Sequence, residues 1–164
     1  MLASMGLPSR QDCDSMCPTT QRFERGPVAV AECFQEIPCD PCSDVCPVGA
    51  VRPFSRLVDH PVIDFEICTG CCMCVARCPG QAIFVVDGAF SDSEDLVVMP
   101  YEFLPQPEVG AAITALDRTG QAVTAARVVA VRRQERFDRT VLLSVAVPKG
   151  FGMVVRAARL EAGE

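Results

Sequence analysis

The chain has 164 residues and a formal net charge of −6. That length gives room for one ordinary domain or two small ones. An acidic surface repels the phosphates of nucleic acid, so we expect protein partners and no nucleic acid. The longest apolar runs, such as residues 82–86, are far shorter than the ~20 residues of a membrane-spanning helix, so we expect no membrane insertion.

All eleven cysteines lie in the first half of the chain, and none follows Cys78. Disulfides would need an oxidising compartment, which a secreted protein reaches through a signal peptide. Residues 1–10 lack the basic and apolar regions of such a peptide, so we expect a cytoplasmic protein. In the cytosol, clustered thiols are more often metal ligands than disulfides.

The first segment, residues 1–21, carries Cys13 and Cys17 in a C-x3-C-P sequence. This sequence imitates the end of a cluster motif, but no partner cysteines precede it. We expect a flexible, disordered arm with free thiols. The alternative is a third site or a labile metal at this arm.

Residues 22–90 contain an internal repeat with an offset of 32 residues. Each half predicts a short strand, a cysteine-bearing loop, a helical turn and a second short strand. The entry strands are expected at 28–31 and 61–65, and the exit strands at 50–54 and 82–86. The repeat places Glu36, Cys39, Cys42, Cys46 and Pro47 on Cys68, Cys71, Cys74, Cys78 and Pro79.

Residues 91–164 contain no cysteine and no histidine. Short apolar runs at 96–101, 111–116, 122–131 and 140–147 are separated by turn signals, which predicts four strands. Strands of this spacing favour a small all-β, barrel-like or sandwich domain. We expect a helix at residues 153–160.

The second half of the repeat contains the full sequence C-x2-C-x2-C-x3-C-P, with cysteines at 68, 71, 74 and 78. Three thiolates two residues apart on a tight loop can surround three corners of one iron-sulfur cubane. The fourth cysteine, one helical turn later, points away from it. The run resembles that of bacterial ferredoxins, in which the fourth cysteine ligates the other of two clusters.

The same logic assigns ligands in both halves. Cys46 crosses over to complete one 4Fe-4S cluster, and Cys78 crosses over to the other. The first cluster takes Cys46, Cys68, Cys71 and Cys74, and the second takes Cys39, Cys42 and Cys78.

The second cluster still lacks one ligand, because Glu36 occupies the position that matches Cys68. Three interpretations compete: Cys33 reaches the iron through a longer loop, Glu36 ligates as a carboxylate, or the site holds a three-iron cluster. We favour Cys33, because soft thiolates suit iron-sulfur clusters better than carboxylates do.

Residues 32–51 and 68–83 resemble the two-cluster ferredoxin subunit of multi-subunit, flavin-containing amino-acid dehydrogenases of the dye-linked L-proline dehydrogenase kind. The similarity extends over about residues 22–164 and follows the bacterial-ferredoxin signature. It implies that flavin-containing dehydrogenase subunits oxidise the substrate, and that iron-sulfur centres carry the electrons away within a hetero-oligomer.

We therefore expect an α+β protein, with a ferredoxin-like dicluster domain over residues 22–90 followed by a small all-β barrel-like domain over 91–164. It would relay electrons through two 4Fe-4S clusters from the flavin-containing partner to an external acceptor. No Gly-rich phosphate loop is present, so we expect no nucleotide, flavin or catalytic site in this chain.

Two other functions are compatible with the cysteines. A free-standing ferredoxin would end soon after residue 83, and a zinc-binding interaction module would place eight thiolates in two tetrahedral sites. The C-terminal domain is expected to dock the clusters onto a partner; the alternative is that it shields the clusters of its own chain.

Four further residues are not expected to bind a cluster. Cys72 lies between cysteines that already have the ligand register, and the single histidine, His60, is expected in a loop. Tyr101 and Phe103 are expected to pack in the core of the C-terminal domain.

Overall fold

The computed structural model describes residues 6–14 and 16–160. Residues 1–5 and 15 of the expected N-terminal arm lie outside the described residues. Residues 161–164 of the expected C-terminal domain also lie outside them. The helices are α2 (Arg10–Asp14), α3 (Thr20–Phe23), α4 (Pro41–Asp44), α5 (Met73–Arg77) and the 3-10 turn η1 (Glu135–Phe137). The strands are β1 (Val28–Ala31), β2 (Ile83–Asp87), β3 (Glu94–Pro100), β4 (Ala112–Leu116), β5 (Ala122–Arg132), β6 (Leu142–Pro148) and β7 (Ala157–Leu160).

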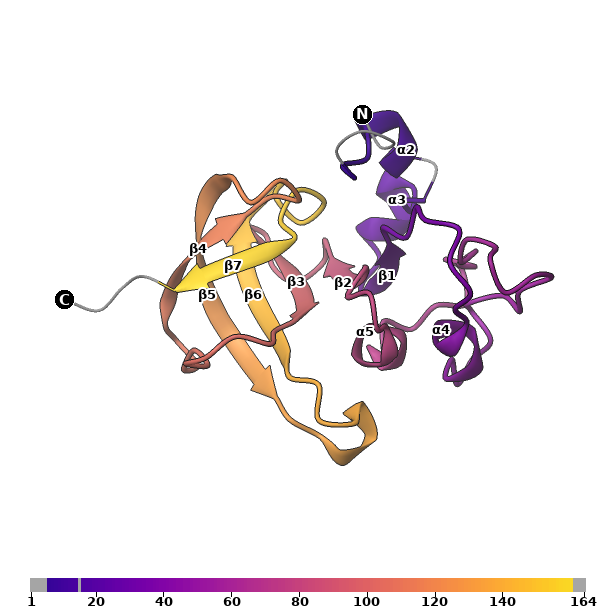
Figure 1. Ribbon diagram of the computed structural model, residues 1–164. Helices are drawn as coiled ribbons and strands as arrows, with labels where there is room; N and C mark the ends of the chain where they lie inside the picture. Colours follow the sequence, from indigo (N-terminus) through magenta and orange to yellow (C-terminus); the bar gives the residue numbers. More distant parts are fainter. Residues whose placement is uncertain (1–5, 15, 161–164) are drawn as a thin grey trace.

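A single antiparallel sheet dominates this mixed fold. Its strand order is β1-β2-β3-β6-β5-β4-β7. The boundary expected near residue 90 lies between β2 and β3, and these two strands pair with each other. One sheet thus runs from the cysteine-rich segment into the C-terminal segment. Figure 1 shows the short helices at one end of the molecule and β4 to β7 at the other.

The internal repeat is visible in the strand pairing. Ala31 pairs with Ile83 at one end of the β1–β2 pair, and an isolated bridge joins Ile63 to Val51. The two pairs are equivalent, because the 32-residue offset of the repeat relates Ala31 to Ile63 and Val51 to Ile83. The entry strand of each half therefore pairs with the exit strand of the other half. The strands expected at 50–54 and 61–65 are wrong beyond this bridge, because Pro53 has no N–H with which to extend the ladder.

The four strands expected in the C-terminal segment are confirmed as β3, β4, β5 and β6. The helix expected at 153–160 is wrong. Its last four residues form β7, which pairs with β4 from Ile113↔Leu160 to Leu116↔Ala157. The edge of β4 offers unpaired N–H and C=O groups there, and tertiary pairing overrides a weak local preference.

The two faces of the sheet pack against different hydrophobic cores. Val28 and Val30 of β1 point into the core shared with the C-terminal strands. Ala29 and Ala31 point the other way, into a second core that contains Cys42 and Cys74. Because strand residues alternate between faces, the small alanines lie on the cysteine side and leave space there.

The N-terminal arm is not disordered where the structure describes it. In Figure 1, α3 lies between α2 and β1, and Cys13 of α2 is only 4% exposed. Thr19 caps α3 by accepting a hydrogen bond from the backbone N–H of Arg22. The expectation of a disordered arm is wrong for these residues. None of the described helices has the length and apolar character to span a bilayer.

Candidate iron-sulfur centres

Four cysteines line one cavity, which we call the Cys33 site: Cys33, Cys39, Cys42 and Cys78. Cys42 lies in the first turn of α4, and Cys78 ends α5. Burial raises the pKa of the Cys42 thiol to about 11, and the charges of Cys78, Cys39 and Cys33 add to the rise. The four thiols are therefore close enough to influence one another.

The other four expected ligands line a second cavity, the Cys68 site: Cys46, Cys68, Cys71 and Cys74. Cys74 belongs to α5 and is 6% exposed. Burial raises the pKa of its thiol, and nearby Cys68, Cys71, Cys72 and Cys46 raise it further. Each cavity thus brings together one of the two expected ligand sets, with Cys46 and Cys78 exchanged between the halves.

The two candidates for the missing ligand, Cys33 and Glu36, lie in different places. Cys33 lines the cavity with Cys39 and Cys42. Glu36 is exposed and lines neither cavity. This arrangement favours Cys33 over a carboxylate ligand, and it gives the site four sulfur atoms.

The donor set suits 4Fe-4S clusters. All eleven cysteines are free thiols, and soft thiolates are the ligands that such clusters take. Since burial raises the pKa of Cys42 and Cys74, these thiols would hold their protons in the absence of a cluster. Binding of a cluster by these cysteines would therefore release protons and would be favoured by rising pH.

The described part of the chain places no three His, Cys, Asp or Glu side chains around a single metal ion. In a four-iron cluster each cysteine binds its own iron atom, so the sulfur atoms stand around the cluster rather than around one ion.

Backbone N–H groups point at the crossing cysteines in a pattern that follows the repeat. Ala50 donates to the sulfur of Cys46 at 3.1 Å, and Ala82, its equivalent, donates to the sulfur of Cys78 at 3.4 Å. At the Cys68 site, Ala29 also donates to Cys68 at 3.4 Å. Hydrogen bonds to ligand sulfur are one of the influences on cluster potential.

Two arginines beside the Cys68 site were missed by sequence reasoning. Arg22 is 7% exposed and donates to the carbonyl oxygens of Cys68 at 2.7 Å and Phe65 at 2.6 Å. Arg132 donates to the sulfur of Cys72 at 3.2 Å. Neither residue has a motif signal, because each is distant in sequence from the cysteine that it contacts.

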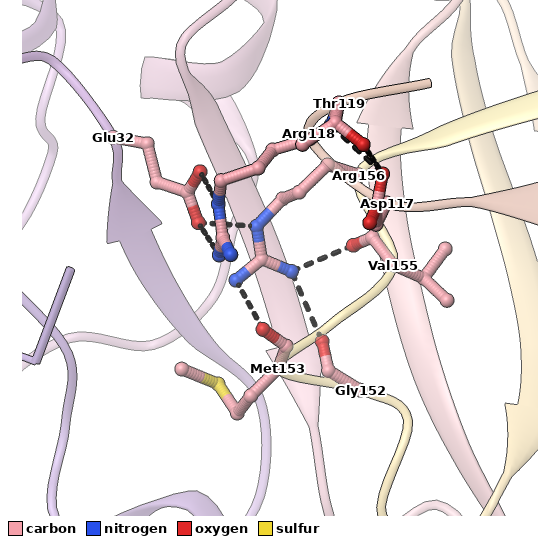
Figure 2. Close-up of polar contacts among 8 residues, drawn as sticks. All are labelled: Glu32, Asp117, Arg118, Thr119, Gly152, Met153, Val155 and Arg156. Atoms are coloured by element: carbon pink, nitrogen blue, oxygen red, sulfur yellow. Dashed lines mark hydrogen bonds and ion pairs between the residues drawn. The ribbon is translucent and has the colours of Figure 1, made fainter. Parts of the chain in front are cut away.

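A buried ion network joins the cysteine-rich segment to the C-terminal strands (Figure 2). Glu32, next to Cys33, accepts hydrogen bonds from Arg118 at 2.8 Å and from Arg156 at 2.6 Å. Burial by itself would raise the pKa of Glu32, but the two guanidinium groups outweigh it and hold the pKa below its ordinary value. The stabilising contribution is therefore present at neutral pH and is lost as pH falls through the lowered pKa.

The remaining candidate residues lie in different surroundings. Cys72 is 2% exposed, lines the Cys68 site and donates to the carbonyl of Gly70. His60 lies in a loop beside a different cavity. Tyr101 packs in the core as expected. The expectation for Phe103 is wrong, because Phe103 is 71% exposed, although its ring forms a T-shaped pair with that of Tyr101.

A family model described as a 4Fe-4S binding domain matches residues 61–84. A ferredoxin-type protein NapF from Haemophilus influenzae is 40% identical over 56 residues, which cover 33% of this chain and 32% of the relative. A selenate reductase subunit from Mesobacillus selenatarsenatis is 31% identical over 86 residues, covering 49% of this chain and 29% of the relative.

One subunit of an ion-translocating oxidoreductase complex from Methanosarcina acetivorans is 47% identical over 47 residues, covering 29% of this chain and 17% of the relative. The chain thus spans about a third or less of the length of these curated relatives. No solved structure matches significantly. The chain carries a ferredoxin-type 4Fe-4S binding domain, and domains of this kind serve electron transfer.

Proposed function

We propose that this chain is an electron-transfer subunit that holds two 4Fe-4S clusters, one at the Cys33 site and one at the Cys68 site. The observation that carries the proposal is the lining of the two cavities: each contains one expected set of four cysteines drawn from both halves of the repeat, and Cys72 also lines the Cys68 site. When bound, such clusters supply one-electron redox chemistry. The cysteines hold them, and the apolar residues around the cysteines limit access of water.

The exchange of Cys46 and Cys78 ties the two sites together. Cys42 and Cys46 lie in and just after α4 but line different cavities, and the same holds for Cys74 and Cys78 around α5. One helical turn thus separates a ligand of one site from a ligand of the other. Neighbouring redox centres suit a relay in which an electron enters at one and leaves at the other.

The partner follows from the resemblance of residues 32–51 and 68–83 described above. A flavin-containing dehydrogenase subunit would supply the electrons, and an external carrier would accept them. Two of the similar proteins have the names of oxidoreductase subunits, which supports assembly into a complex. The C-terminal strands would dock the cluster-bearing segment onto that partner, in the reducing cytoplasm where the thiols stay free.

Iron and acid-labile sulfide analysis of the anaerobically purified chain tests the proposal. We expect about eight iron atoms per chain, and a matching amount of sulfide, because two four-iron clusters are held. A double substitution of Cys13 and Cys17 to serine is the control, and it should leave the iron content unchanged. A content near four irons, or a colourless protein that contains zinc, would contradict the proposal.

A further inference from the structure

The repeat gives each cluster site a residue at the same place, between two of its cysteine ligands. At the Cys33 site this residue is Asp40, between Cys39 and Cys42, and at the Cys68 site it is Cys72, between Cys71 and Cys74. Each is the N-cap residue of its helix, α4 or α5. The two sites therefore differ in charge at equivalent positions.

Arg132 brings a positive charge to Cys72. Its Nη2 lies 3.2 Å from the Cys72 sulfur, and its Nε is buried without a hydrogen-bond partner. The guanidinium also lies over the ring of buried Phe137, 5.9 Å from its centre. Within the described residues, Arg132 forms no ion pair, so no carboxylate neutralises its charge.

Arg22 brings a second positive charge to the same site. Its partners are the carbonyl oxygens of Gly26, Pro27, Phe65 and Cys68, at 2.6 to 3.1 Å. These partners satisfy its N–H groups but carry no net charge. Among the described residues, Arg22 also makes no ion pair.

The cations near the Cys33 site pair with carboxylates instead. Arg56 pairs with Asp59, which lines that cavity, at 3.0 Å, and Glu32 pairs with Arg118 and Arg156. Asp40 is exposed and adds its negative charge next to Cys39. These groups thus sum to zero charge near the Cys33 site, whereas Arg132 and Arg22 leave the Cys68 site positive.

We infer that Arg132 and Arg22 raise the reduction potential of the Cys68 site above that of the Cys33 site. In the singly reduced chain, the electron therefore resides mainly at the Cys68 site. Cluster potentials respond to net charge and to hydrogen bonds around the sulfur atoms. A nearby positive charge favours the reduced form, which carries one more electron. The inference rests on the proposed function, because it requires both sites to be loaded.

The step that follows is a single electron transfer. One electron leaves the reduced Cys33 site, which becomes oxidised, and enters the oxidised Cys68 site, which becomes reduced. No bond forms or breaks and no proton moves. The donor to the Cys33 site is the reduced flavin of the proposed partner, and in the test below it is dithionite.

An anaerobic redox titration of the full chain with dithionite, followed by EPR, tests the inference. Cys33→Ser and Cys68→Ser variants assign the two signals, since each should alter one of them. We expect the signal of the Cys68 site to appear first as the potential is lowered. In Arg132→Gln, the ratio by which the electron favours the Cys68 site should fall about three- to tenfold, a tenfold fall being about 59 mV for one electron.

Three variants separate charge from structure. Arg132→Lys should restore most of the wild-type potential, because it keeps the positive charge. Arg133→Gln, at the next and exposed position, is the matched control and should leave both midpoints unchanged. Asp40→Asn should raise only the midpoint of the Cys33 site.

The outcomes distinguish this inference from the proposed function. With about eight irons present, reduction of the Cys33 site first, or an Arg132→Gln titration identical to wild type, overturns the inference alone. Loss of potential in Arg132→Lys equal to that in Arg132→Gln overturns the role of charge. An iron content near four overturns the proposed function and the inference together.

Discussion

The proposed eighth ligand depends on where two single side chains lie. The thiol of Cys33 lines the cavity that Cys39, Cys42 and Cys78 share, whereas Glu36 lies at the surface. The charges of Cys78 and Cys39, after burial itself, raise the pKa of Cys33, as expected for thiols that face one another. The repeat position holds a carboxylate, but the loop brings the softer thiol of Cys33 to the cavity.

Replacement of the two candidate ligands tests this arrangement. Cys33→Ser should lower the iron content and alter only the EPR signal of the Cys33 site, because serine oxygen is a harder ligand than thiolate. Glu36→Ala should leave both signals and the iron content unchanged. If Glu36→Ala instead converts a four-iron signal to a three-iron one while Cys33→Ser has no effect, the ligand assignment is wrong.

At the scale of elements, the buried ion network holds β1 against the C-terminal strands. Glu32 follows β1, Arg118 lies in the turn between β4 and β5, and Arg156 precedes β7 (Figure 2). Arg156 also donates to the carbonyls of Gly152, Met153 and Val155. Because Cys33 is the next residue after Glu32, the same contacts restrain the loop that carries a proposed ligand.

Removal of the carboxylate should destabilise this junction strongly. Glu32→Gln leaves two guanidinium groups without their counterion, and loss of one partner of a buried ion pair costs about 3–5 kcal/mol in the free energy of unfolding. Anaerobic denaturant titration would measure it. The matched control is Glu94→Gln, whose partner Arg127 is half exposed, and this change should cost about 0–1 kcal/mol. Equal losses in the two variants would contradict a special role for Glu32.

At the scale of the whole molecule, one sheet separates two cores of different composition. The core on one face takes Val28, Val97 and Val145 from three strands, and none of its fully packed members is a cysteine. The core on the other face includes Cys42, Cys72 and Cys74. The first core can therefore persist without metal, whereas the second depends on what the cysteines bind.

Removal of iron should affect the two cores unequally. In protein stripped of iron by chelation, we expect α4 and α5 to lose protection from amide hydrogen exchange, because metal binding supplies much of the folding free energy of small metal sites. Amides of β5 and β6 should keep most of their protection. Hydrogen exchange with mass spectrometry measures both regions in one sample. A collapse of protection in β5 and β6 together with α5 would mean that the two cores unfold as one.

The sequence by itself determined the cysteine motif, the repeat and most strands, because these depend on local spacing. The C-x2-C-x2-C-x3-C-P run specifies which thiols share a loop and which lies one helical turn away, and a short run of apolar residues specifies a buried strand such as β1. The tertiary structure alone decided that residues 157–160 form β7, and that Arg22, Arg132 and Glu32 surround the sites. The contacts that hold these residues in place come from distant parts of the chain, and no local pattern records a contact that exists only after the sheet has formed.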